Sequence, residues 1–344
     1  MIKQVQNEKS KNDFIEFGLQ FSPAEVKQLP TEGICFVAYE NDKVVARCQV
    51  QLQTGSHTTA TIGYFHALNK PEMVKELLAE AVNFIKTEGA EVVIGPMNGD
   101  TWHSYRFNLG PFADEAFIKE PHNPTYYPAL WENAGFEVVD SYDSFLVESS
   151  KLAADNQEKF YKRAIKNGYT FHNLTAENYQ QFLPVIYQIS CEIFSQNRHY
   201  SEITYDEFEK LYLPAKSLLI KDLSWIAQDS EGNYAGYVFA FPDYHIALES
   251  MKGKTNLLAK MKFLINKRKA KRCCLKTLGV TSKYRGSGLT AALTYLVYKN
   301  SHLQGYNQTY MCLMHSDNDS RKFSGNQHKP FRKYALYRYK AHAE

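Results

Sequence analysis

The sequence lacks the long hydrophobic run that a membrane-spanning helix needs, because no stretch of about 18 apolar residues occurs in its 344 positions. Its first residues also lack the apolar core of a secretory signal, and we therefore expect a cytoplasmic protein. The six cysteines follow neither a disulfide framework nor the spacing of a metal site. We expect reduced thiols in the core and no metal.

A large excess of charge of one sign is also missing, since the formal net charge is only +3. Residues 1–148 carry 11 Lys and Arg against 21 Asp and Glu, a balance of −10, whereas residues 149–344 carry 29 against 16, a balance of +13. With 44% hydrophobic and 22% charged residues, the chain is not collagen-like, coiled-coil or wholly disordered. The length favours two domains, and the basic half favours an anionic ligand.

Hydrophobic patterning predicts the same order of elements twice. In the first half we expect a hairpin, a strand, an amphipathic helix, a buried strand, a short helix and two closing strands, at residues 33–52, 59–65, 71–88, 91–95, 126–134, 136–139 and 144–148. In the second half we expect a strand, two helices, two hairpin strands, a further strand, a helix and two closing strands, at residues 169–174, 176–194, 205–213, 224–227, 234–241, 273–280, 289–303, 309–314 and 334–340. We interpret this order as a tandem duplication of one mixed α/β unit of the α+β class, a mixed sheet flanked by helices, with domains at 1–150 and 151–344 and the boundary near residues 149–156.

The clearest chemical signal is the glycine turn between the expected strand at 273–280 and the expected helix at 289–303. Gly286 and Gly288 remove side chains that would keep a phosphate away from the free backbone N–H groups of a helix N-terminus. Positive charge is added by Lys283 and Arg285. The turn is neither a Walker A loop nor a full dinucleotide-binding signature, but a pyrophosphate fits it.

In these residues the sequence resembles the GCN5-related N-acetyltransferase (GNAT) superfamily. The acyl-CoA motif of that superfamily, Gln/Arg-x-x-Gly-x-Gly/Ala after the fourth strand, is matched by residues 283–288 with Lys in the first place. The resemblance implies acetyl-CoA or another acyl-CoA as donor, held at its pyrophosphate by backbone amides and along its pantetheine arm by the strand at 276–280. The donor-binding residues that it implies are Leu278, Val280, Lys283, Tyr284, Arg285, Gly286, Ser287, Gly288, Leu289, Thr290 and Asn318.

One departure from the superfamily concerns the catalytic acid. GNAT enzymes commonly carry a Tyr in the helix after the fifth strand, where it protonates the departing thiolate, but residues 318–325 contain no Tyr. Tyr334 and Tyr337 come later, in the last expected strand. The sequence therefore assigns neither the general acid nor the general base.

The first half resembles the same superfamily in element order but lacks the loop, since residues 62–71 contain no paired glycines. We expect this half to bind no CoA and to shape the acceptor site. Its polar and aromatic residues fit either a helix start capped by Asn123 or an acceptor pocket. The candidate pocket residues are Asn98, Trp102, His122, Tyr126 and Tyr127. In the second half Glu192, His199 and Asp243 are expected near the acceptor cleft, as a general base or as structural residues.

Residues 252–272 contain nine Lys and Arg and no acidic residue, interleaved with Leu, Met, Phe and Ile. As a helix this segment is basic and amphipathic, which is typical of contact with a membrane surface, RNA or another protein. The alternatives are an insertion that packs its apolar side on its own domain, and a cluster of lysines that attracts the phosphates of CoA.

The sequence thus favours an N-acetyltransferase whose second domain binds acetyl-CoA and transfers the acetyl group to an amine of a small molecule or peptide. A backbone N–H, such as that of Val280, would stabilise the oxyanion. Two alternatives stay open: an aminoacyltransferase that uses aminoacyl-tRNA, and a catalytically inactive CoA-binding regulatory protein. The sequence gives no indication of the oligomeric state or of the acceptor.

Overall fold

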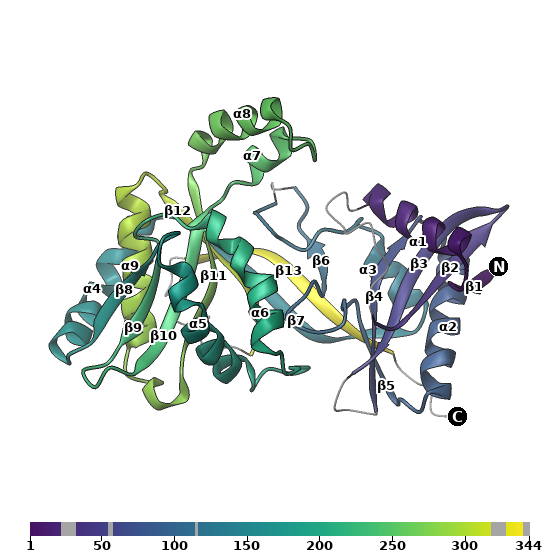
Figure 1. Cartoon of the computed structure of the whole chain (residues 1–344), viewed down its shortest axis with the longest axis horizontal. Helices are drawn as coiled ribbons and strands as arrows, with labels where there is room; N and C mark the ends of the chain where they lie inside the picture. Colours follow the sequence, from purple (N-terminus) through teal and green to yellow (C-terminus); the bar gives the residue numbers. More distant parts are fainter. Residues whose placement is uncertain (22–31, 54–57, 114–115, 318–327, 340–344) are drawn as a thin grey trace. The chain divides into compact units, whose positions relative to one another are not determined.

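The computed structural model describes residues 1–21, 32–53, 58–113, 116–317 and 328–339. They divide into two compact units. The first comprises Met1–Asp114, Glu120–Tyr142 and Arg332–Glu344, and the second comprises Glu115–Lys119 and Asp143–Phe331. In each unit helices flank a mixed sheet, as the sequence predicts (Figure 1).

The sheet of the first unit has the strand order β1, β2, β3, β4, β5, β13 and β7, and β6 also pairs with β13. Its elements are β1 (Ile2–Gln4), α1 (Glu8–Phe21), β2 (Ile34–Glu40), β3 (Lys43–Leu52), β4 (Thr59–Ala67), α2 (Pro71–Thr87), β5 (Val92–Gly95), β6 (Phe107–Gly110) and α3 (Tyr127–Asn133), with parts of β7 (Phe136–Val147) and β13 (His328–Tyr339). Strands β4 and β5 are parallel, whereas β1 to β4 pair antiparallel in sequence and β13 pairs antiparallel with β5 and β6.

Local sequence explains the best-predicted elements of this unit. Pro71 occupies the first turn of α2, where its missing N–H costs nothing. The apolar stripe of the helix is entirely buried: Val74, Leu77, Leu78, Ala81, Val82 and Ile85. Between β2 and β3, Asn41 and Asp42 adopt left-handed φ angles of 49° and 59°, a tight turn whose twist suits a hairpin.

The sheet of the second unit has the strand order β7, β12, β11, β10, β9 and β8. Its elements are α4 (Ser150–Lys166), β8 (Thr170–Leu174), α5 (Tyr179–Phe194), α6 (Tyr205–Tyr212), η1 (Leu213–Leu218), β9 (Ser224–Gln228), β10 (Tyr234–Pro242), α7 (His245–Ser250), α8 (Leu257–Asn266), η2 (Lys267–Lys269), β11 (Arg272–Val280), η3 (Ser282–Tyr284), α9 (Leu289–Leu303) and β12 (Gln308–His315). Strands β11 and β12 are parallel, and β8 to β11 pair antiparallel.

Helix α9 forms the centre of the second unit, with the bounds that the sequence predicts. It contacts α4 as well as strands β9, β10 and β11. Small residues allow this close approach, because Ala153 and Ala154 of α4 are buried. The hydroxyl of Thr294 donates a hydrogen bond of 2.6 Å to the buried side chain of Gln157.

The expected boundary at residues 149–156 lies at the start of α4. Ser149 caps the helix by accepting a hydrogen bond from the N–H of Leu152. The polar composition of this stretch is typical of a linker, but its buried residues, Ser150, Ala153 and Ala154, are small and give little hydrophobic signal. The two compact units divide between Tyr142 and Asp143, inside β7, a single strand at the place where the sequence predicts two.

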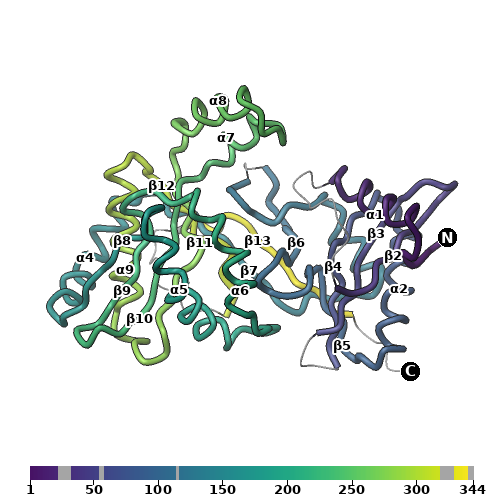
Figure 2. Tube along the Cα trace, viewed as in Figure 1, coloured from purple at the N-terminus to yellow at the C-terminus, as the bar shows by residue number. Residues whose placement is uncertain are grey.

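The strand expected at residues 334–340 forms, but in the first unit rather than at the end of the second. Tyr337 of β13 lies opposite Gly95 of β5, and Tyr334 lies opposite Asn108 of β6. Figure 2 shows the yellow C-terminal trace running alongside β5. An alternating strand contains no information on which sheet receives it. The sequence patterns also do not predict β1, α1, β6, α4 or α7.

Candidate functional site

The predicted donor loop forms the turn from β11 into α9. After the single turn of η3, Gly286 and Gly288 adopt left-handed φ angles of 77° and 83°, which glycine tolerates and other residues rarely adopt. Because the first N–H groups of a helix have no acceptor within it, those of Thr290 and Ala291 stay available at this end. The turn therefore offers backbone donors and a helix dipole to an anion.

The two glycines leave different amounts of space. A Cβ atom on Gly286 would meet no atom within 4 Å, whereas one on Gly288 would lie 3.0 Å from Cδ1 of Phe160 in α4. Gly286 thus keeps the outside of the turn clear, and Gly288 lets α4 pack against it. The turn that the sequence predicts as an anion site thus has free space beside Gly286.

Hydrogen bonds within the second unit hold the turn in place. Glu192, at the end of α5, accepts from the N–H of Ser282 at 2.7 Å and from its hydroxyl at 2.8 Å. The N–H of Thr281 donates to the carbonyl of Ala235 at 2.9 Å. Glu192 is a candidate for the acceptor cleft, and its carboxylate binds Ser282 of the turn before α9. Such preorganisation lowers the entropic cost of binding.

The two cations of the loop differ in their surroundings. The Lys283 ammonium lies 3.7 Å from the Asp229 carboxylate and 3.8 Å from that of Glu231, in the β9–β10 hairpin. The hydroxyl of Tyr284 donates to Asp229 at 2.6 Å, which lowers the pKa of that carboxyl and raises the pKa of the tyrosine. Arg285 is exposed and has no ion-pair partner among the described residues. Arg285 is therefore the loop cation free to meet an anion.

Beyond the middle of β11, one edge of the strand has no paired strand among the described residues. Its parallel pairing with β12 runs from Arg272–Gln308 to Leu275–Met311, although β11 continues to Val280. The N–H of Thr281 points to β10, and the N–H groups of a strand alternate in direction. Those of Leu278 and Val280 consequently point away from β10, to the open edge. This edge can accept an extended, amide-containing chain as an added strand.

The candidate base Asp243, which follows β10, and the late tyrosines make hydrogen bonds within the fold. Asp243 accepts from the N–H groups of Ile118 at 3.0 Å and His245 at 3.2 Å, and burial raises its pKa. Tyr334 and Tyr337 are buried in β13 and donate to Glu120 and Glu132, respectively. His199 is partly buried, with a left-handed φ of 60°. Asn318 and the rest of residues 318–325 lie outside the described residues, so the general acid stays unassigned.

Three of the five acceptor candidates bind the backbone of β4. The side-chain oxygen of Asn98 accepts from the N–H of Tyr64 at 2.7 Å. The Tyr127 hydroxyl accepts from the N–H of Ala67, and the Tyr126 hydroxyl donates to the carbonyl of the same residue, both at 2.9 Å. These side chains hold the strand, and the acceptor role stays a prediction.

The remaining candidates of the first unit do not join this group. Trp102 is partly exposed, and its N–H donates to Asp100 at 2.8 Å, while His122 is exposed. Asn123 does not cap α3, whose N-cap residue is Tyr126. It instead accepts from the N–H of Asn108 at 2.7 Å and donates back to its carbonyl at 3.2 Å.

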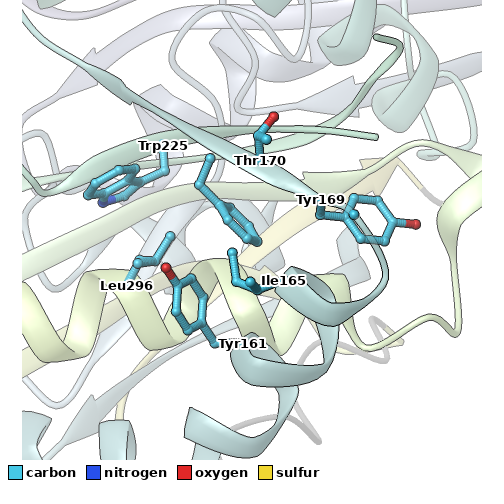
Figure 3. Close-up of a pocket in the computed structure, with 8 residues that line it drawn as sticks. Tyr161, Ile165, Tyr169, Thr170, Trp225 and Leu296 are labelled. Atoms are coloured by element: carbon cyan, nitrogen blue, oxygen red, sulfur yellow. The ribbon is translucent and has the colours of Figure 1, made fainter. Parts of the chain in front are cut away.

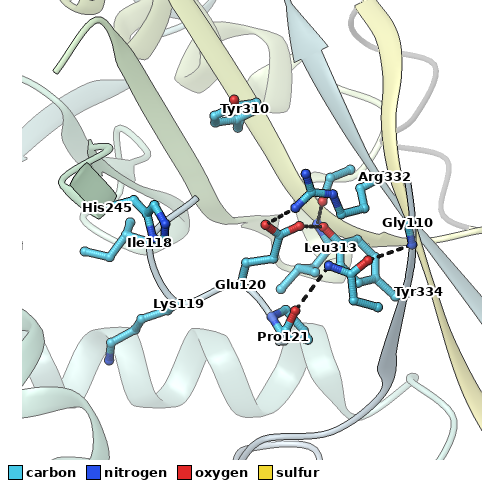
Figure 4. A network of polar contacts seen from close by, with 12 residues as sticks. Gly110, Ile118, Lys119, Glu120, Pro121, His245, Tyr310, Leu313, Arg332 and Tyr334 are labelled. Carbon is cyan, nitrogen blue, oxygen red and sulfur yellow. Dashed lines mark hydrogen bonds and ion pairs between the residues drawn. The ribbon is translucent and has the colours of Figure 1, made fainter. Parts of the chain in front are cut away.

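A buried ion pair next to these asparagines was not predicted. The side chains of Arg332 and Glu120 are 3% and 0% exposed and lie 2.6 Å apart, and Tyr334 donates to the second carboxylate oxygen (Figure 4). The two partners are 212 positions apart in the sequence, and no local pattern could have paired them. The cluster closes the first unit around β13.

An apolar hollow of about 530 Å³ lies in the second unit, away from the residues predicted to bind a ligand (Figure 3). Helix α4, the β8 region, β9 and α9 form its walls. The lining residues are Tyr161, Ile165, Gly168, Tyr169, Thr170, Phe171, Trp225 and Leu296. No residue of the donor turn lines it.

The basic segment does not pack its apolar side on its own unit, contrary to one of the interpretations of the sequence. In α8 only Ala259 is buried, and Phe263 packs on Tyr244 with ring centroids 5.7 Å apart. The other apolar side chains of the helix are at least half exposed: Leu257, Leu258, Met261, Leu264 and Ile265. Their burial would need a partner.

In the described part of the chain, no group of three or more His, Cys, Asp and Glu side chains is arranged to hold a metal ion. None of the helices described is both long enough and apolar enough to cross a bilayer.

Comparisons with known proteins concern the fold and one distant relative. No protein-family model matches the chain. A bacterial ceramide synthase from Caulobacter vibrioides (strain NA1000 / CB15N) is 20% identical over 274 residues, which cover 77% of this chain and 71% of that protein.

Solved structures resemble the whole chain. A tandem GNAT protein from the clavulanic acid biosynthesis pathway has a TM-score of 0.51 and 11% identity, with 98% of both chains covered. A conserved protein from Enterococcus faecalis V583, described as a probable N-acyltransferase, has a TM-score of 0.53 and 10% identity, covering 98% of this chain and 72% of that chain. A GCN5-related N-acetyltransferase from Anabaena variabilis ATCC 29413 has a TM-score of 0.52 and 9% identity, covering 98% of this chain and 72% of that chain. At such identities the likeness is one of fold.

Proposed function

We propose that this chain, which has the fold of the GCN5-related N-acetyltransferases, transfers an acyl group from acyl-CoA to an amine. The observation that carries the proposal is the juxtaposition at the end of β11. The turn at Gly286 offers backbone N–H donors with free space beside them, and the Arg285 cation lies next to it. This turn follows directly after the open strand edge at Leu278 and Val280. Acyl-CoA has the matching sequence of groups, since its pyrophosphate is followed by a pantetheine arm with two amides.

In the proposed reaction the residues of the second unit act on the donor. The turn binds the pyrophosphate, and the edge of β11 orients the pantetheine arm. The amine nitrogen attacks the thioester carbonyl, a C–N bond forms, the C–S bond breaks, and the proton that the amine loses ends on the CoA thiol. The N–H of Val280, which points to the open edge, is placed to stabilise the developing oxyanion.

The proposal names acetyl-CoA as the first donor to test and leaves the acyl chain to a comparison of donors. A ceramide is an amide of a fatty acid with a long-chain amine, so the name of the distant relative describes N-acylation as well. The acceptor is a small molecule or peptide with an amine. Since acyl-CoA is an intracellular metabolite and all six cysteines are free, the proposal includes a cytoplasmic location.

Calorimetry with acetyl-CoA and with CoA tests donor binding. Gly286→Trp fills the clear space of the turn, and we expect at least a tenfold loss of affinity, which is about 1.4 kcal/mol. Gly305→Trp is the matched control, because Gly305 also has a left-handed φ, meets nothing within 4 Å and lies beyond the opposite end of α9. Equal binding by Gly286→Trp and wild type, or no binding by wild type, contradicts the proposal.

A product screen tests turnover. The wild-type protein is incubated with acetyl-CoA or with a long-chain acyl-CoA and a panel of peptide, small and long-chain amines, and amides are detected by mass spectrometry. We expect an amide that Gly286→Trp forms more slowly than Gly305→Trp. Binding of acyl-CoA without any amide across the panel would instead support a CoA-binding regulatory protein.

An aminoacyltransferase that uses aminoacyl-tRNA is the second candidate, favoured by the +13 balance of residues 149–344. It predicts binding of tRNA with a steep dependence on salt, because released counterions contribute to the affinity. It also predicts no loss of tRNA binding in Gly286→Trp. Filter binding of tRNA to the two glycine variants and to wild type, measured at several salt concentrations, separates this function from the first.

A further inference from the structure

We propose that the α7–α8 projection binds the surface of an anionic lipid bilayer, with the exposed side of α8 inserted among the lipids. The projection consists of residues 243–272, and its two helices lie side by side (Figure 1). The proposal does not depend on the proposed reaction.

The first observation is a continuous apolar stripe that faces solvent. Leu257, Leu258, Met261, Leu264 and Ile265 are 50 to 74% exposed. At 3.6 residues per turn they fall within an arc of about 120° on one side of α8. Exposed apolar residues scattered singly need no explanation, but a stripe along one helix marks an interaction site.

The stripe is on the side of α8 that faces away from its own unit. Ala259, which is buried, and Phe263, which packs on Tyr244 of the preceding loop, lie opposite it on the helix. On α7, Ile246 and Leu248 are also exposed, at 41% and 43%. Packing thus fixes the helix by one side and leaves the apolar side without a covering element among the described residues.

The charge around the stripe identifies its partner as anionic. Lys260 and Lys262 flank the stripe on either side by their helical positions. The segment 252–271 has six further Lys and Arg and no acidic residue, and none of these eight cations has an ion-pair partner in the described part of the chain. A second copy of the same face would bring like charges together, which disfavours self-association through it.

Aliphatic residues between lysines suit a bilayer better than a nucleic acid. Single-stranded nucleic acids bind through aromatic side chains that stack on bases, and the ring of Phe263 is packed against Tyr244. A bilayer with anionic lipids offers an apolar layer beneath negative headgroups. Leu, Met and Ile side chains enter that layer, and flanking lysines extend to the phosphates.

Flotation of the full chain with lipid vesicles tests the proposal. We expect binding to vesicles of phosphatidylcholine with phosphatidylglycerol, and at least tenfold weaker binding to phosphatidylcholine alone. Leu258→Gln/Ile265→Gln and Lys260→Gln/Lys262→Gln should each reduce binding about tenfold. The controls are Leu152→Gln/Leu303→Gln and Lys151→Gln/Lys162→Gln, which change exposed residues elsewhere in the second unit and should have no effect.

A second measurement reports insertion directly. The fluorescence of Leu258→Trp should be quenched by vesicles that contain brominated lipid, and that of Leu152→Trp should not. Soluble glycerophosphoglycerol should not displace the protein from vesicles, because the headgroup alone lacks the apolar layer.

Three results would overturn the proposal: no binding to anionic vesicles at low salt, equal binding by the apolar double variant and wild type, or absence of quenching of Leu258→Trp. Binding of tRNA that the lysine variant loses and the apolar variant retains would assign the cations to nucleic acid instead. Wild-type binding of acetyl-CoA is a separate readout, so failure here and failure of the proposed function are distinguishable.

Discussion

The two units contain the same strand arrangement and use it differently. In each, a parallel pair of strands is joined only at its start: β4 with β5 from Thr59–Val92 to Thr61–Ile94, and β11 with β12 from Arg272–Gln308 to Leu275–Met311. In each, the longer strand continues beyond the pairing and leads to a helix, α2 or α9. The two units differ at the edge of that longer strand.

In the first unit the chain itself binds this edge. The N–H of Met97 donates to the carbonyl of Ile62 at 2.9 Å, and side chains of Asn98, Tyr126 and Tyr127 bind further backbone groups of β4. In the second unit the corresponding edge, at residues 276–280, has no paired strand in the described part of the chain. An edge bound by its own fold supports stability, whereas an open edge next to a glycine turn suits a ligand. This difference supports the proposal that only the second unit binds acyl-CoA.

The largest expected effect concerns the polar groups that close the first unit. Glu120→Leu removes the carboxylate that lies 2.6 Å from the buried Arg332 guanidinium, and we expect a loss of about 3–5 kcal/mol in the free energy of unfolding. Glu137→Leu is the control, because Glu137 and Arg338 are paired 3.2 Å apart on the surface, where such pairs contribute about 1 kcal/mol or less. Urea denaturation measures both. Equal losses would show that burial does not set the contribution of these pairs.

The next effect concerns the two cations of the donor turn. Arg285→Gln should weaken acetyl-CoA binding by about 1.5–3 kcal/mol, the range for hydrogen bonds to charged groups. Lys283→Gln should weaken it less than about threefold, because the Lys283 ammonium already lies near Asp229 and Glu231. Calorimetry at low salt compares the two variants. A larger loss for Lys283→Gln than for Arg285→Gln would contradict this assignment.

A smaller effect is expected at the bound edge of β4. Tyr127→Phe leaves the buried N–H of Ala67 without an acceptor and should lower the free energy of unfolding by about 1–3 kcal/mol. Tyr126→Phe, at a partly exposed position, should cost about 0.5–1.5 kcal/mol. Neither should change acetyl-CoA affinity. Unchanged stability together with an altered choice of amine would instead favour the acceptor pocket that the sequence suggests.

The smallest effect is a dependence on acid at the donor turn. The hydrogen bond from Tyr284 holds the pKa of Asp229 below its ordinary value of 3.8. The resulting stability is present above that value and is lost as pH falls through the lowered pKa of the folded state. The difference in stability between wild type and Tyr284→Phe should therefore shrink as pH is lowered from about 7 to about 3. A difference that stays constant or grows with acid would show that Asp229 is not the group involved.

Local patterns predicted the parts of the fold that depend on local forces. The stripe of α2, with Pro71 at its start, and the bounds of α9 follow from helical periodicity. The glycine turn was predicted because Gly286 and Gly288 stand between a strand and a helix, and their left-handed φ angles agree with that prediction. Open space at Gly286 is consistent with an anion site.

Contacts between distant residues could not be predicted. The pairing of Lys283 with Asp229 joins the turn after β11 to the β9–β10 hairpin, and Arg332 and Glu120 are 212 positions apart. The sequence also did not show whether the apolar side of α8 is buried. Residue spacing defines an apolar stripe but not whether another element covers it. The sequence likewise did not show which sheet β13 joins, because any antiparallel edge accepts an alternating strand.

The return of β13 to the first unit has a consequence for synthesis on the ribosome. Residues 333–338 pair with β5 and β6, so the first unit lacks one of its strands until these residues have been translated. In that interval the edge of β5 is unpaired, and unpaired strand edges recruit other chains. A fragment that stops near residue 150 would retain the same exposed edge. We therefore expect such a fragment to aggregate, and co-expression with a peptide of residues 328–344 to restore solubility.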